Sequence, residues 1–239
     1  MAQTRERRHD EDSGKTAAGM RPRRRGRPTP MENGAGRTRL IAATRELLRT
    51  VPPPKLTRQD VAAAAGVDPA LVRYYFGSLS ALLTEALKEQ IEELRVVMAA
   101  LAREKGTPAE RLRRRVAALV RFLAENPAYH QLFVEQIVYG EGEWAAASRA
   151  RVTRIAFGEW TSILDDGRAD GTLREDVDAR LFYVAMLGAC EFFVRGSPLF
   201  RELFPGGTGR ADLLTAYSEF LADFALHGIG RPPARRRAK

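Results

Sequence analysis

Residues 57–83, TRQDVAAAAGVDPALVRYYFGSLSALL, contain the pattern that decides the fold. Thr57 is placed to cap a short alanine-rich helix, and Gly66 supplies the backbone conformation that a tight turn requires. Asp68 and the proline after it start a second short helix, because aspartate favours the cap position and proline the first helical position. Ala62 and Gly66 have the spacing expected where two short helices cross steeply. The stretch is therefore predicted to form a helix-turn-helix.

The other residues of this stretch divide into a packing set and an exposed set. Apolar positions are predicted to pin both short helices to a supporting helix: Val61, Ala65, Val67, Val72, Phe76 and Leu82. The second helix then exposes its other side to the major groove of DNA and the flanking phosphates. The predicted DNA contacts are Thr57, Arg58, Pro69, Ala70, Arg73, Tyr74 and Tyr75. The alternative is a helical hairpin that touches no DNA.

The distribution of charge favours the DNA interpretation. The chain has 239 residues and a formal net charge of +9. Residues 1–36 hold nine basic and five acidic side chains, and residues 229–239 hold five basic and none acidic, so these two ends account for the whole excess. Within the neutral remainder, residues 37–86 carry seven basic against four acidic side chains. Positive charge is thus concentrated where the motif lies, as expected if this part meets a polyanion.

Between the polar ends, the sequence is typical of an all-α protein. Apolar residues recur at three- and four-residue spacing, and no alternating strand pattern is present in the sequence. Residues 1–36 and 229–239 are predicted to be disordered, because they contain few large apolar groups. About nine helices are predicted, over residues 37–50, 57–65, from 69, 80–103, 108–124, 127–138, 143–166, 178–194 and 211–227.

Composition excludes several classes of protein. A single cysteine rules out an internal disulfide, and three histidines are too few for a zinc site of standard spacing, so we expect no metal and no cofactor. No apolar run reaches the roughly 18 residues of a membrane span, and no signal segment follows the N-terminus, so a cytoplasmic protein without a membrane partner is expected. No catalytic or nucleotide-binding motif is present, and an enzyme is not predicted.

Residues 37–83 resemble the DNA-binding domain of the tetracycline-repressor (TetR) family. The resemblance rests on IAATRELL in the first helix and on DVAAAAGVDPALVRYYFGSLSALL after it. It implies a three-helix DNA-binding domain followed, over residues 84–228, by a helical domain that binds a small molecule and holds a homodimer. Two positions depart from the family pattern. Arg73 stands where a tyrosine is usual, and Leu79 where a phosphate-binding lysine is usual.

The basic arm offers a second predicted DNA contact. Residues 24–28, RRGRP, resemble the core of an AT-hook, in which an extended Arg-Gly-Arg-Pro lies in the minor groove. Arg25 and Arg27 are the arginines predicted to meet the negative potential there. The alternative is a solvated leader that adds only nonspecific attraction to DNA.

The larger domain contains candidates for an effector pocket and for a dimer interface. Aromatic residues predicted to line a pocket are Phe122, Phe133, Trp144 and Trp160, with Tyr129, His130 and Glu135 as polar candidates; the alternative is that the aromatic side chains are plain core. The last two helices each carry a stripe of small and apolar residues that suits the interface which the resemblance implies, although the same stripes also suit packing inside a monomer. The predicted interface consists of Leu181, Ala185, Gly188, Ala189, Phe192, Leu214, Tyr217, Leu221 and Phe224.

The predicted function is a ligand-responsive transcriptional repressor. As the resemblance implies, a homodimer binds a palindromic double-stranded DNA operator, and a small-molecule effector changes the separation of the two recognition helices. The alternative, suggested by the basic ends, is an architectural DNA-binding protein with weak sequence preference.

Overall fold

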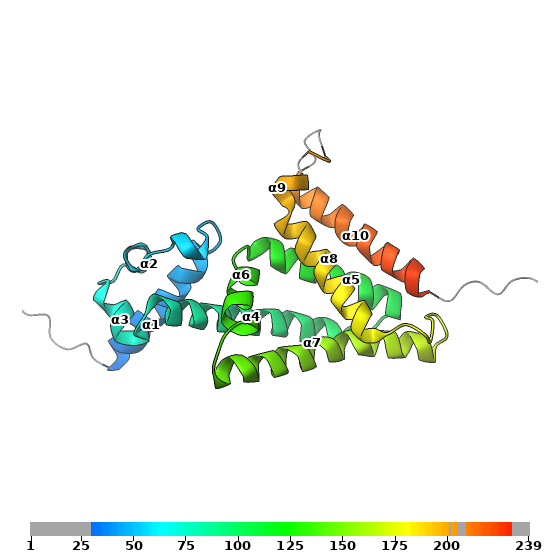
Figure 1. Ribbon diagram of the computed structural model, residues 1–239, viewed down its shortest axis with the longest axis horizontal. Coiled ribbons are helices and arrows are strands. Elements are labelled where there is room, and N and C mark those ends of the chain that lie inside the picture. Colours follow the sequence, from blue (N-terminus) through cyan, green and yellow to red (C-terminus); the bar gives the residue numbers. More distant parts are fainter. Residues whose placement is uncertain (1–29, 201, 205–208, 231–239) are drawn as a thin grey trace, which may run out of the picture.

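The computed structural model describes residues 30–200, 202–204 and 209–230. These residues are helical apart from their loops, and their one β pairing is a single bridge between Leu173 and Gly230, so the all-α prediction is confirmed. Figure 1 shows the arrangement. In chain order the elements are α1 (Pro30–Leu47), η1 (Pro53–Lys55), α2 (Arg58–Ala65), α3 (Ala70–Phe76), α4 (Leu79–Arg103), α5 (Pro108–Glu125), α6 (Tyr129–Phe133), η2 (Val134–Val138), α7 (Glu143–Ala169), α8 (Ala179–Arg195), α9 (Ser197–Phe200) and α10 (Arg210–Ile229).

Helix α1 begins earlier than the sequence predicted. Disorder was expected through residue 36, and this is wrong for the last seven of those residues, which form the first turns of the helix. Gly36 is buried, and a Cβ at this position would come within 3.0 Å of the hydroxyl oxygen of Tyr75. The next residue, Arg37, forms an ion pair with Glu85 of α4. The end of the extension thus packs against α3, and the residue after it is paired with α4; both contacts are distant in sequence.

The predicted helix-turn-helix is formed by α2 and α3. Gly66 ends α2 with φ 63° and ψ 39°, the left-handed conformation that glycine adopts without a steric penalty. The Asp68 carboxylate accepts a hydrogen bond of 2.7 Å from the amide of Ala70 and so caps the start of α3, as predicted. Val61 and Val72 are fully buried, and they fix the two short helices against α1 and α4.

Thr57 is the N-cap of α2 and forms a complete capping box. Its Oγ1 accepts a hydrogen bond of 3.2 Å from the Asp60 amide, and its own amide donates one of 2.9 Å to the Asp60 carboxylate. We therefore expect Thr57→Ala to lower the free energy of unfolding by about 1 kcal/mol, while Thr57→Ser retains the cap. Urea unfolding followed by circular dichroism measures the difference.

The same box predicts a pH dependence. Hydrogen bonds from the side chain and the backbone of Thr57 lower the pKa of Asp60. A carboxyl group with a lowered pKa stabilises the fold above its unfolded-state pKa, and this stabilisation is lost as the pH falls through the folded-state value. We expect the difference between wild type and Thr57→Ala to shrink below about pH 4. A difference that stays constant down to pH 2 would show that the box does not act through the Asp60 carboxylate.

Helix α4 belongs to both predicted domains. Ser78 caps it, and the predicted boundary between residues 83 and 84 falls inside its second turn. Its N-terminal part packs against α1 and α3, and its remainder packs against α5 and α6 (Figure 1). Arg45 of α1 also forms ion pairs with two glutamates of α4, Glu89 and Glu93. Helix α4 thus connects α1 and α3 directly to the larger bundle.

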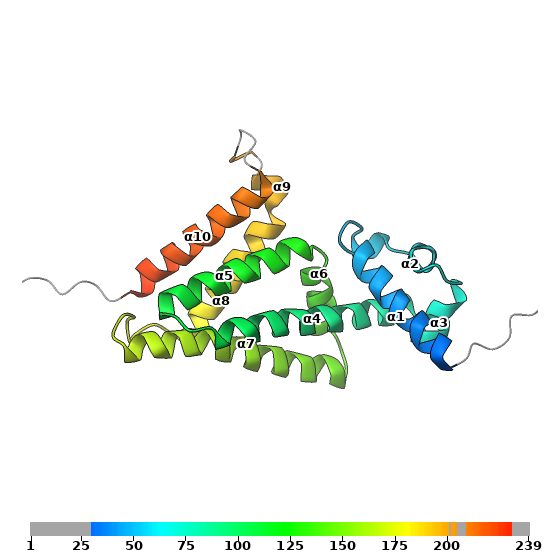
Figure 2. The same ribbon diagram turned by 180° about the vertical axis from the view of Figure 1, so that it is seen from behind.

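The remaining helices form a bundle around α5. Helix α5 contacts α4, α7, α8 and α10, and Figure 2 shows it lying between α10 and α4. A capping box starts it, with Thr107 and Glu110 as the reciprocal partners. The helix predicted over residues 127–138 is instead the short α6 followed by the π-helical turn η2. Across the residues described, none of the helices combines the length and the apolar character needed to cross a membrane.

Candidate functional site

The exposed face of α3 lies opposite its buried residue Val72. Arg73 is exposed and forms no ion pair within the described part of the chain, and Tyr74 exposes 60% of its surface. The start of α2 lies in the same domain and contributes further exposed residues. The predicted contacts that the structure leaves exposed are Thr57, Arg58, Pro69, Ala70, Arg73 and Tyr74.

Tyr75 lies on the other side of α3 from this exposed set. Its ring is half-buried against Gly36 of α1, and its centroid is 4.9 Å from that of Tyr74 in an edge-on arrangement. The next residue, Phe76, lies under the guanidinium of Arg37, with 5.2 Å from Cζ to the ring centroid. These aromatic side chains join the recognition helix to α1. The predicted arm contacts, Arg25 and Arg27, lie outside the described residues.

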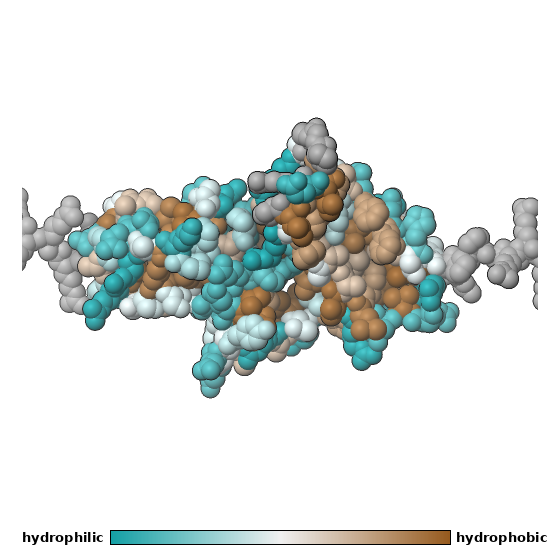
Figure 3. Space-filling model, turned by 45° about the horizontal axis from the view of Figure 1, so that its top comes forward, coloured by the Kyte–Doolittle hydropathy of each residue, from teal (hydrophilic) through white to brown (hydrophobic). Residues whose placement is uncertain are grey.

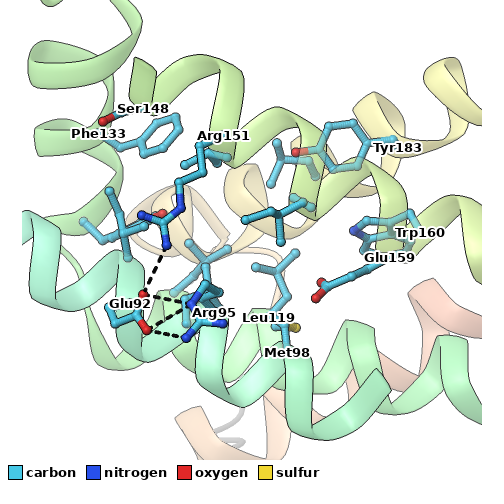
Figure 4. A pocket seen from close by; sticks show the side chains of 18 of the residues that line it. Glu92, Arg95, Met98, Leu119, Phe133, Ser148, Arg151, Glu159, Trp160 and Tyr183 are labelled. Carbon is cyan, nitrogen blue, oxygen red and sulfur yellow. Dashed lines mark hydrogen bonds and ion pairs between the residues drawn. The ribbon is translucent and has the colours of Figure 1, made fainter. Parts of the chain in front are cut away.

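A cavity of about 340 Å³ lies between α4, α5, α7 and α8 (Figure 4). Three of the predicted aromatic residues, Phe133, Trp144 and Trp160, line it. Phe122 does not line it, so that prediction is wrong. Its ring is buried behind Tyr129, with the centroids 5.1 Å apart, and Tyr129 is the side chain that reaches the cavity. Aliphatic side chains complete the wall: Ile91, Leu94, Met98, Leu119, Leu123, Val152, Ile155 and Leu187.

Two of the predicted polar residues do not reach the cavity. The His130 imidazole contacts the Glu191 carboxylate, which does line the cavity, and burial lowers the pKa of His130. The carboxylate of Glu135 accepts a hydrogen bond of 2.7 Å from Gln131 and is exposed. Tyr129 lines the cavity as predicted, and burial raises the pKa of its hydroxyl group.

One end of the cavity holds a buried charged pair that the sequence analysis missed. Arg115 of α5 forms an ion pair with Glu159 of α7, and its Cζ lies 5.1 Å from the centroid of the Trp160 ring. The Arg115 Nε is buried and has no hydrogen-bond partner among the described residues, and desolvation lowers the pKa of this guanidinium. The sequence contained one signal for this site, because Arg115 occupies an apolar position of α5, between Leu112 and Leu119.

The other end of the cavity is its charged mouth. Glu92 accepts hydrogen bonds of 3.0 and 2.8 Å from the Nε of Arg95, and its carboxylate lies 3.8 Å from the guanidinium of Arg151 (Figure 4). The hydrogen bond from Arg95 lowers the pKa of Glu92. Lys88 completes the mouth, with its Nζ 5.0 Å from the centroid of the Trp144 ring. Opposite ends of one apolar cavity are therefore polar.

An exposed apolar face covers α8 and α10. Figure 3 shows hydrophobic side chains gathered on this side of the bundle. Of the residues predicted for a dimer interface, Leu181, Ala185, Gly188 and Phe192 of α8 and Phe224 of α10 are exposed on this face. Two of its large members, Val184 and Phe220, were not predicted; they expose 64% and 61% of their surface.

The other predicted interface residues pack within the protomer. Leu221 is buried within the single chain, because this side of α10 faces α5, so the prediction of Leu221 as a dimer-interface residue is wrong. The Tyr217 ring stacks on Phe193, with centroids 3.6 Å apart, and its hydroxyl donates a hydrogen bond of 2.8 Å to the Ala189 carbonyl. Ala189, Leu214 and Tyr217 are all half-buried.

Comparison with known proteins agrees with this architecture. Residues 40–86 match the model of bacterial regulatory proteins of the tetR family, and residues 108–224 match the model of a tetracyclin repressor-like C-terminal domain. The two matches together span more than half of the chain. No curated protein matches the chain.

Several solved structures have the same fold. A bacterial regulatory protein of the tetR family from Rhodococcus RHA1 has a TM-score of 0.65 at 19% identity, over 83% of this chain and 98% of its own. The ketosteroid regulator KstR2 of Mycobacterium tuberculosis has a TM-score of 0.63 at 18% identity, over 82% and 95%. The regulator FadR of Bacillus subtilis, in complex with stearoyl-CoA, has a TM-score of 0.60 at 19% identity, over 80% and 98%. The chain belongs to the TetR family of transcriptional regulators.

Proposed function

We propose that the protein is a ligand-responsive transcriptional repressor that binds a palindromic operator as a homodimer. The observation that carries the proposal is the position of α4. Its N-terminal part packs on α1 and α3, while its side chains from Lys88 to Met98 line the cavity. A molecule in the cavity contacts the same helix that supports the exposed face of α3. One helix therefore contacts both proposed sites, which gives a coupling between two distinct sites a physical route.

The exposed apolar face on α8 and α10 favours a second copy of the chain as its partner. Contiguous apolar patches of this kind mark interaction surfaces, and most homo-oligomers are symmetric dimers in which one face meets itself. Leu181, Phe192 and Phe224 would then be buried between the protomers. A dimer presents two copies of α3, so that each reads one half-site and the operator mirrors the two-fold axis of the protein.

The cavity walls favour an effector with a large apolar body. Aliphatic and aromatic side chains make up most of the lining, with the Glu159 carboxylate toward one end and Glu92 and Arg151 toward the other. Two proteins of similar fold, KstR2 and FadR, are a ketosteroid regulator and a regulator in complex with stearoyl-CoA, and apolar effectors of that size agree with this lining. For release of DNA, the effector has to bind the DNA-free arrangement of the protein more tightly than the DNA-bound one.

A mobility-shift assay with the DNA upstream of the gene tests this function and separates it from the architectural alternative. We expect one duplex to remain bound in the presence of a large excess of random DNA, because specific sites are typically bound about 10³-fold or more tightly than nonspecific DNA. An architectural protein would be removed from every duplex equally by the same competitor. If no duplex is retarded under these conditions, the proposal of a repressor is rejected.

A further inference from the structure

Lys88 stands at the junction between the cavity and the DNA-binding domain. Its Nζ donates a hydrogen bond of 2.6 Å to the Glu85 carboxylate and at the same time lies over the Trp144 ring in the cavity wall. Glu85 also forms an ion pair with Arg37 of α1. The Arg37 guanidinium lies over the ring of Phe76, at the end of the recognition helix. The side chain of Lys88 is half-exposed. One carboxylate thus joins a cation of the cavity mouth to a cation of the DNA-binding domain.

The charges that line the cavity are segregated. At the inner end, Arg115 pairs with Glu159. The carboxylate of Glu191 also lines the cavity and contacts the imidazole of His130. The mouth contains three cations, Lys88, Arg95 and Arg151, and one carboxylate, Glu92.

Glu92 is largely committed to Arg95, with which it forms its shortest contacts. Arg151 lies 3.8 Å from the same carboxylate and exposes 63% of its side chain. The mouth therefore has unused hydrogen-bond donors and excess positive charge beside an apolar interior. With a neutral or cationic effector these donors would remain hydrogen-bonded to water, whereas an anionic group would accept hydrogen bonds from them.

Resting on the proposed function, we propose that the effector is an apolar molecule with one anionic group, held at the mouth by Lys88 and Arg151. Lys88 is then the positioning residue that carries the signal. When its ammonium group turns to the anion of the effector, it leaves Glu85, and Glu85 is left with Arg37 alone. The contact between α4 and α1 changes, and with it the support of Phe76 in the recognition helix.

Binding of two matched dyes tests the ligand class without DNA. Anilinonaphthalene sulfonate and N-phenyl-1-naphthylamine share one aromatic skeleton, and only the first carries an anionic group. The chain has two tryptophans, Trp144 and Trp160, and both line the cavity, so energy transfer from tryptophan is strongest for dye bound in or near it. We expect the sulfonate to bind about tenfold more tightly than the amine, from two partly exposed charge contacts. Equal affinities, or no energy transfer with either dye, would overturn the proposal.

Lys88→Met tests the role of the lysine, because methionine keeps most of the apolar stem and removes the charge. We expect this variant to reduce the preference for the sulfonate to about threefold. Lys105→Met is the matched control, since Lys105 is exposed and does not line the cavity, and it should keep the wild-type preference. If Lys88→Met keeps the wild-type preference for the sulfonate, Lys88 does not bind the anionic group.

Hydrogen exchange tests the transmission, again without DNA. At saturating sulfonate dye, amides of residues 34–40 and 70–76 should change their exchange rates in the wild type, and this response should be absent in Lys88→Met at the same occupancy. An unchanged wild-type exchange pattern would overturn the transmission step. Neither the dye titrations nor the exchange measurement uses DNA. A failure to find an operator would therefore reject the proposed function without affecting the results on the ligand and on Lys88.

Discussion

Replacing Phe220 and Phe224 together with glutamate is expected to convert the proposed dimer into a monomer and to weaken operator binding about 100-fold or more. Both rings are mostly exposed in the single chain, at 61% and 68%, so the protomer itself should remain folded. In a symmetric dimer the four added carboxylates would lie in one apolar interface, where unpaired charges are strongly destabilising. The loss of DNA affinity follows because the second half-site contact ceases to be intramolecular.

The mass measured by light scattering after size exclusion, together with a mobility-shift titration, checks this prediction. Tyr139→Glu is the matched control, since Tyr139 exposes 78% of its surface and lies outside the face on α8 and α10. The control should keep the wild-type mass and affinity. A variant that carries both glutamates and still elutes as a dimer would show that this face is not the interface.

Replacing Arg115 with methionine is expected to lower the free energy of unfolding by about 3 kcal/mol. The arginine side chain is buried, and its guanidinium pairs with Glu159 and covers the Trp160 ring. Methionine fills much of the same volume but leaves the Glu159 carboxylate without its cation at a mostly buried position. Removing one partner of a buried ion pair typically costs about 3–5 kcal/mol, because the remaining charge stays desolvated.

Chemical denaturation of two further variants separates the charge effect from the loss of packing. The double variant Arg115→Met/Glu159→Gln has no orphaned charge and should recover more than half of the lost stability. Arg121→Met lies on the same helix at an exposed position and should change stability by less than about 0.5 kcal/mol. If the double variant were as unstable as Arg115→Met, the destabilisation would come from lost packing and not from the unpaired Glu159 carboxylate.

The parts of the fold that the sequence predicted are those with local causes. Thr57 caps α2 through a residue three positions away, Gly66 ends the same helix through its own φ angle, and Asp68 caps α3 two residues ahead. Each of these signals is complete within a few residues, so no knowledge of the tertiary structure is needed to interpret it. The helix-turn-helix and the order of the helices follow from such signals.

The errors arose where tertiary packing, and not the local sequence, decides which neighbour a side chain contacts. Periodicity assigns Phe122 and Leu221 to apolar sides of their own helices, but the crossing of α5 with its neighbours decides whether that side meets the cavity, another helix or solvent. Tyr75 lies against Gly36, which is 39 positions earlier in the chain. The link from Arg37 to Glu85 spans 48 positions. Contacts of this range carry no local pattern, and the charged junction at Lys88 was therefore missed.

The central claim is that the exposed face of α3 reads base pairs. Selection of bound duplexes from a random pool, followed by titration of Arg73→Ala on the selected site, tests it most directly. We predict an inverted repeat as the selected site, a loss of about 1–3 kcal/mol of binding free energy for Arg73→Ala on it, and little change on random DNA. Arg103→Ala, an exposed substitution at the far end of α4, should bind as the wild type does. A pool that yields no enriched sequence, or an Arg73→Ala protein with wild-type affinity and preference, would contradict the claim.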